Sequence, residues 1–161
     1  MILPWSALMV KRSKSKTKNS NIGGIIMPNE NYETEQLMSD DVNFYIMGFE
    51  SKVQERLMVI RFMALDIFQN VEEKIYHSVP TLFMGGKNIM CYGAYKNHIS
   101  IHLGYDWKND WETRANNIMD FLKENYPQYR YTKFTIQLPH KLPFPNELIQ
   151  EICEMLWNDR V

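Results

Sequence analysis

Residues 98–104 carry the most constraining pattern in the chain, because apolar and polar side chains alternate along them. One face of an extended strand receives Ile99, Ile101 and Leu103, and the other receives two histidines with a serine between them. Residues 88–95 also favour a strand, and Lys96-Asn97 is short enough to join the two as a tight hairpin. The apolar face must cover a core, and a layer of helices is its natural partner.

Three longer segments have apolar side chains at steps of three and four residues, which predicts amphipathic helices. They cover residues 48–69, 109–125 and 146–156. Residues 131–138 alternate again and predict a further strand. The expected strands are largely grouped along the chain and do not alternate regularly with the helices. This order favours an α+β fold, a two-layer sandwich that has an antiparallel sheet with helices on one face.

Two shorter helices are expected before the hairpin. Ser39 is a suitable N-cap for a helix over residues 40–47. Asn70 and Glu73 have the spacing of a capping box, in which each side chain satisfies a backbone N–H at the start of a helix. This spacing predicts a short helix over residues 70–77, which ends before Pro80 because proline moves the preceding residue out of the helical region.

Charge divides the chain into unequal parts. Residues 1–27 carry five of the 18 basic residues and no acid, so we expect a basic, disordered tail there, with Met27 as an alternative start. The other 13 basic residues stand against 19 acids, which gives residues 28–161 a net charge of −6. We expect an acidic lead-in over residues 28–44 and the α+β domain over residues 45–161.

Several classes of function are disfavoured. A negatively charged domain repels phosphate backbones, so no nucleic-acid partner is expected. No stretch of about 18 apolar residues is present, so we expect no membrane partner. Two cysteines are too few for a disulfide framework and favour a reduced, cytoplasmic protein. The chain has no glycine-rich phosphate loop, no His-Glu-x-x-His motif and no nucleophile elbow, so we expect no enzymatic activity.

Three short motifs follow one another in the second half of the chain. The first is Tyr76 with Pro80 and Phe83, followed by the turn Gly85-Gly86. The second is the run Ala94-Tyr95-Lys96-Asn97-His98-Ile99. The third is Thr135-Ile136-Gln137-Leu138-Pro139, which precedes Leu142-Pro143 and a final helix. In these motifs and in their order, residues 45–157 resemble the YdhG-like domain family.

This resemblance implies a YdhG-like, frataxin-like architecture and one function. The family includes a bacterial frataxin-like protein that delivers iron to cluster and haem assembly. The resemblance therefore implies a non-catalytic iron chaperone with iron–sulfur assembly proteins as partners, which holds Fe(II) weakly and has no tightly bound cofactor. The alternative is a ligand- or protein-binding module that uses the open sheet face around Tyr95 and His98.

The candidate metal ligands are carboxylates within or just after a stretch, residues 19–51, that contains no Lys or Arg. Iron as a hard cation prefers carboxylate oxygen, and a chaperone needs exposed sites from which the metal is easily released. The candidates are Glu30, Glu33, Glu35, Asp40, Asp41, Glu50 and Glu55. The same acids also suit a segment that only keeps the protein in solution.

The candidate binding residues lie on the predicted hairpin and in the loop after it: Cys91, Tyr95, Lys96, His98, His102 and Trp107. A two-residue turn places Cys91 opposite His102, where both could contact one zinc or iron ion. His98 is about 13 Å from His102 along the strand and cannot share that ion, so a packed sheet face is the competing interpretation. Trp107 is included because an exposed tryptophan in a loop often anchors a contact.

Overall fold

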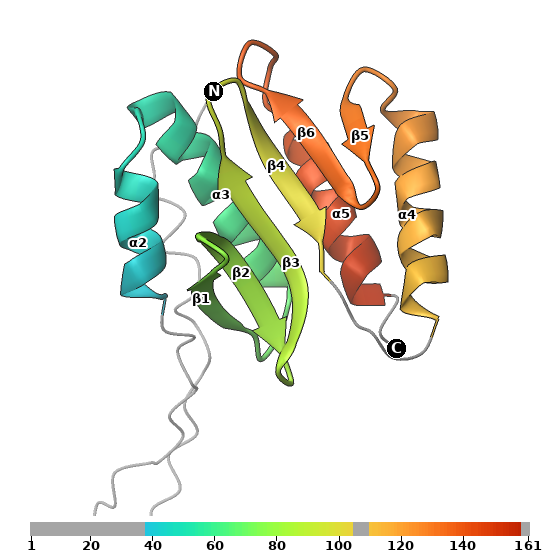
Figure 1. Ribbon diagram of the computed structural model, residues 1–161, viewed down its shortest axis with the longest axis horizontal. Helices are drawn as coiled ribbons and strands as arrows, with labels where there is room; N and C mark the ends of the chain where they lie inside the picture. The colour runs from blue at the N-terminus through green and yellow to red at the C-terminus, as the bar shows by residue number, and fades with distance from the viewer. Residues whose placement is uncertain (1–37, 105–109, 159–161) are drawn as a thin grey trace, which may run out of the picture. The chain divides into compact units, whose positions relative to one another are not determined.

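A computed structural model describes residues 38–104 and 110–158, which form four helices and six strands (Figure 1). In chain order these are α2 (Asp40–Met47), α3 (Ser51–Ile67), β1 (Glu72–Tyr76), β2 (Val79–Met84), β3 (Lys87–Ala94), β4 (His98–Leu103), α4 (Trp111–Asn125), β5 (Arg130–Thr132), β6 (Thr135–Pro139) and α5 (Asn146–Asn158). The α+β class expected from the sequence is confirmed. The expected tail over residues 1–27 and most of the acidic lead-in lie outside the described residues.

The six described strands form one antiparallel sheet in the order β1-β2-β3-β4-β6-β5. β3 and β4 form the expected hairpin, and Cys91 lies opposite His102 in it. The chain then passes through α4 and returns, so that β6 pairs with β4 and Pro139 lies opposite His98. This strand order places the segment after β6 beside the turn between β3 and β4.

One face of the sheet is covered and the other is open. Figure 1 shows α3 and α5 behind the sheet. The inward side chains of β4, Ile99, Ile101 and Leu103, are buried in a core shared with the helices. The outward side chains of the same strand are only half-buried. The expected arrangement of helices on one face is therefore confirmed. None of the described helices is long and apolar enough to cross a bilayer.

The short helix expected over residues 70–77 is wrong, because Glu72–Tyr76 is strand β1. Its residues alternate between the two faces, and Glu73 points inward. His77 and Ser78 have φ angles of 49° and 67°, which is the conformation that two-residue hairpin turns prefer, and they lead directly into β2. The spacing that suggested a helix cap belongs instead to a strand that carries one buried carboxylate.

The single strand expected over residues 131–138 is also wrong, because two strands, β5 and β6, occupy this region. A turn at residues 133–134 separates them. The apolar alternation continues through the turn, since the Phe134 side chain is buried although the residue is in neither strand. The extra strand places Arg130 opposite Gln137 on the open face.

A buried ion pair joins the helical layer to the sheet. Arg61 of α3 is fully buried, and its guanidinium donates to both carboxylate oxygens of Glu73, with Nη2 to Oε2 at 2.6 Å. The same guanidinium donates to the Ser39 carbonyl at 3.1 Å and to the Asn43 side chain. The Tyr92 hydroxyl of β3 donates to Glu73 at 3.2 Å. Loss of either charged partner would leave the other buried without compensation.

We predict that Glu73→Gln lowers the free energy of unfolding by about 3 kcal/mol, because the Arg61 charge would remain buried opposite a neutral amide. The matched control is Glu72→Gln, since Glu72 forms an exposed ion pair with Lys74 at 3.4 Å. The control should change the free energy by less than about 0.5 kcal/mol. Urea unfolding of the full chain measures both, and equal losses would contradict the role of the buried pair.

Candidate functional site

The acidic candidates do not gather into a metal site in the described part of the chain. Asp40 and Asp41 are exposed in the first turn of α2, and Glu50 and Glu55 are exposed at the start of α3. Three further candidates lie outside the described residues: Glu30, Glu33 and Glu35. Among the residues that the structure describes, no three His, Cys, Asp or Glu side chains lie close enough together to hold a metal ion.

Cys91 and His102 lie opposite each other on β3 and β4. Burial raises the pKa of the Cys91 thiol to about 11, so it is protonated at neutral pH. Nδ1 of His102 lies 2.5 Å from the Thr135 hydroxyl of β6, and burial lowers the pKa of its imidazole. These features fit a neutral, packed stretch of sheet better than a metal centre.

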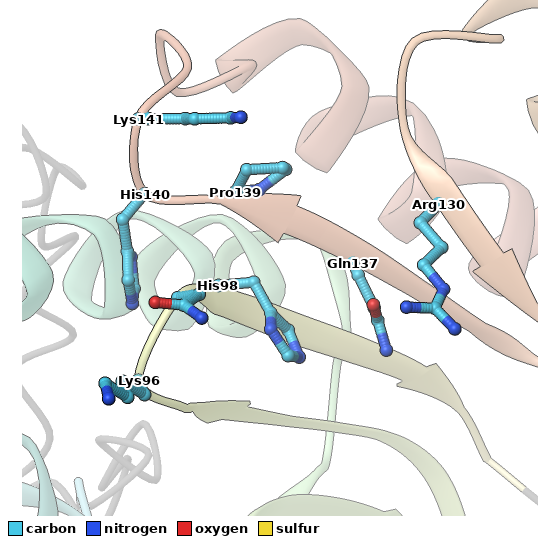
Figure 2. A pocket seen from close by; sticks show the side chains of 8 residues that line it. Lys96, His98, Arg130, Gln137, Pro139, His140 and Lys141 are labelled. Carbon is cyan, nitrogen blue, oxygen red and sulfur yellow. The ribbon is translucent and has the colours of Figure 1, made fainter.

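A pocket opens on the uncovered face, where the β3–β4 turn approaches the segment after β6 (Figure 2). Its volume is about 490 Å³, in the range of small-molecule sites. Six of its lining residues are Lys96, His98, Arg130, Gln137, His140 and Lys141. They come from the β3–β4 turn, from β4, β5 and β6, and from the segment after β6. The pocket therefore depends on the strand order of the sheet.

Hydrogen bonds hold two distant backbone segments together beside the pocket. The backbone N–H of His140 donates to the Asn97 carbonyl at 2.9 Å. Its ring Nε2 lies 2.7 Å from the Tyr95 carbonyl oxygen, which can only accept, so Nε2 carries the hydrogen. Behind the sheet, Arg56 of α3 donates to the Leu142 carbonyl at 2.8 Å. Both segments are thus held in place without a ligand.

The pocket concentrates positive charge. Lys96, Arg130 and Lys141 are charged at neutral pH, and none of them forms an ion pair with a carboxylate of the described residues. The pKa of His98 lies below its ordinary 6.5, first because burial disfavours the imidazolium and then because the positive charges of His140 and Arg130 repel it. His98 is therefore neutral at pH 7 in a field that attracts anions.

A pair of stacked rings adjoins the pocket. The ring centroids of Tyr95 and His98 are 5.2 Å apart with their planes at 18°, and Tyr95 is 53% exposed. Tyr95, Lys96 and His98, which the sequence analysis selected together, are thus neighbours in space. Cys91 and His102 are paired farther along β3 and β4, and Trp107 lies outside the described residues.

Sequence reasoning missed the residues that make the pocket basic, which are Arg130, His140 and Lys141. They are more than 30 positions from His98 along the chain, and only the pairing of β4 with β6 and of β6 with β5 brings them near it. The sequence held one indication of the pocket, because the alternation in residues 131–138 predicts that Gln137 lies on the open face of the sheet. Pairing that strand with residues 98–104 would have led to the pocket.

We predict that Arg130→Gln raises the pKa of His98 towards 6.5, because loss of a positive neighbour stabilises the imidazolium. His102 is an internal control, since burial and not a neighbouring charge lowers its pKa. NMR titration of the imidazole C–H resonances follows both rings in one sample. If His98 titrates identically in the variant and the unaltered chain, Arg130 contributes nothing to the field in the pocket.

Comparison with known proteins bears on the fold. No protein-family model matches this chain, and no curated protein is similar to it in sequence. The crystal structure of YdhG, a Bacillus subtilis protein of the DUF1801 family, is similar, with a TM-score of 0.60 and 18% sequence identity. The similarity covers 75% of this chain and 91% of that chain. The expected frataxin-like architecture stays a prediction. The chain therefore has a YdhG-like fold.

Proposed function

We propose that this domain is a binding module that holds a small anionic ligand in the pocket on its open sheet face. The proposal rests on three basic side chains, Lys96, Arg130 and Lys141, which line one pocket whose described lining contains no acid. Basic side chains without carboxylates between them attract anions and donate charge-assisted hydrogen bonds to them. The amide of Gln137 is a further donor in the same place.

A small ligand suits the distribution of charge better than a long polyanion does. Residues 28–161 carry a net charge of −6, so the positive field belongs to the pocket and not to the domain as a whole. A nucleic acid would extend beyond the pocket and be repelled by the remaining surface. One anionic group on a small molecule would experience the local field alone.

The chemistry of the lining favours binding without catalysis. The described lining has two histidines, His98 and His140, but no Ser, Thr or Cys as nucleophile and no Asp or Glu as carboxylate base. Cys91 lies outside this lining, and its thiol is protonated at neutral pH. The absence of enzymatic activity is accordingly part of the proposal.

We predict that inorganic phosphate binds the full chain at pH 7.5 and shifts the backbone amide resonances of Asn97 and His98 in an NMR titration. Lys96→Gln should weaken binding about fivefold, because a charge-assisted hydrogen bond is lost. Lys123→Gln on α4 is the matched control, since it removes the same charge from an exposed pair with Asp120. Equal weakening in the two variants, or no binding at all, would refute the proposed site.

Delivery of iron, which the resemblance to the YdhG-like family implies, is the second candidate function. The observation that favours it is the exposure of Asp40 and Asp41 in the first turn of α2, at the end of a stretch rich in acids. Exposed carboxylates bind hard cations weakly and release them easily. In this function the partners would be iron–sulfur assembly proteins, and Fe(II) would be cargo.

For this second function we predict saturable Fe(II) binding by the full chain under anaerobic conditions, with a dissociation constant of roughly micromolar order. Calorimetric titration measures it. Changing Glu33, Glu35, Asp40 and Asp41 to amides should abolish the binding, whereas His98→Ala should leave it unchanged. Absence of binding by the unaltered chain would remove iron delivery and leave the anion pocket as the function to pursue.

A further inference from the structure

Tyr95 presents an exposed aromatic ring beside the basic pocket, because it stacks on His98, which lines the pocket. His98 lines the pocket, and its ring lies nearly parallel to that of Tyr95. More than half of the Tyr95 side chain is exposed, so part of its ring is available for contact. Flat aromatic groups stack on exposed aromatic rings of this kind, whatever their exact chemical identity.

Both ends of the Tyr95 backbone are held by hydrogen bonds. Its N–H donates to the His98 carbonyl at 2.8 Å, and its carbonyl accepts from His140 at 2.7 Å. A ring on such a backbone loses little conformational freedom when a ligand stacks on it, which favours binding. The next residue in the chain is Lys96, whose side chain lines the pocket together with His98.

The charged groups suit a phosphate monoester. Such a group carries between one and two negative charges at neutral pH and presents three terminal oxygens. Arg130 offers a planar fork of donors, and Lys96 and Lys141 offer point charges. A carboxylate has only two oxygens and a single charge, and would leave more of these donors unused.

We propose that the pocket binds an aromatic phosphate monoester, with the phosphate at the basic lining on the side of Lys96 and the flat ring stacked on the exposed face of Tyr95. This inference rests on the proposed anion site and specifies its ligand. Nucleoside monophosphates and simple aryl phosphates share this chemistry. Both join one flat ring system to one phosphate across a short linker.

The test is calorimetric titration of the full chain with phenyl phosphate and with methyl phosphate, which differ only in the group attached to the phosphate. Phenyl phosphate should bind about tenfold more tightly, because only its ring can stack. Tyr95→Leu should remove this difference by weakening the binding of phenyl phosphate, and Tyr95→Phe should retain the difference. The control is Tyr76→Leu, which alters a tyrosine of similar exposure, 45%, on β1.

The outcomes separate the two proposals. Equal affinities for phenyl and methyl phosphate would overturn the aromatic ligand and leave the anion site standing. No binding of either compound would overturn both. A second pair, adenosine monophosphate and ribose 5-phosphate, distinguishes the two sources. An advantage of the adenosine compound larger than that of phenyl phosphate supports a nucleotide, and a smaller advantage supports a simple aryl phosphate.

Discussion

The ion pair between Arg61 and Glu73 determines how the helices and the sheet fit together. A fully buried guanidinium needs acceptors for its donors, because each unsatisfied donor is costly in the interior. Arg61 obtains them from the segment before α2, from α2 and from β1. One side chain of α3 thus sets the positions of three other segments, and β1 is anchored by polar bonds as well as by apolar contacts.

A second arginine, five residues earlier in the same helix, acts in a similar way. Arg56 is largely buried, donates to the Leu142 carbonyl, and lies over the Phe144 ring with its Cζ atom 5.4 Å from the centroid. It therefore holds the segment after β6 from behind the sheet. Helix α3 supports β1 through one arginine and one wall of the pocket through the other, so the open face is shaped from the covered side.

The sequence was a good guide wherever periodicity alone decided the outcome. The β3–β4 hairpin, its register and its inward face followed from the alternation around Ile99 and Ile101, and α3 and α5 followed from their helical stripes. Strand β1 escaped prediction because Glu73 resembles a capping residue in the sequence, and only its burial against Arg61 reveals its role. The basic pocket escaped because it depends on which strands are neighbours, and alternation within a strand does not contain that information.

The strand order also bears on how the domain folds. β1 to β4 form consecutive hairpins with short turns, whereas the pairing of β4 with β6 closes a loop that contains α4 and β5. Closing a long loop costs more chain entropy than closing a two-residue turn, and distant pairings slow folding. The pocket lies across this distant pairing, so it is complete only when the last part of the sheet has docked. A ligand that binds there favours the fully assembled chain by mass action and resists local opening between β4 and β6.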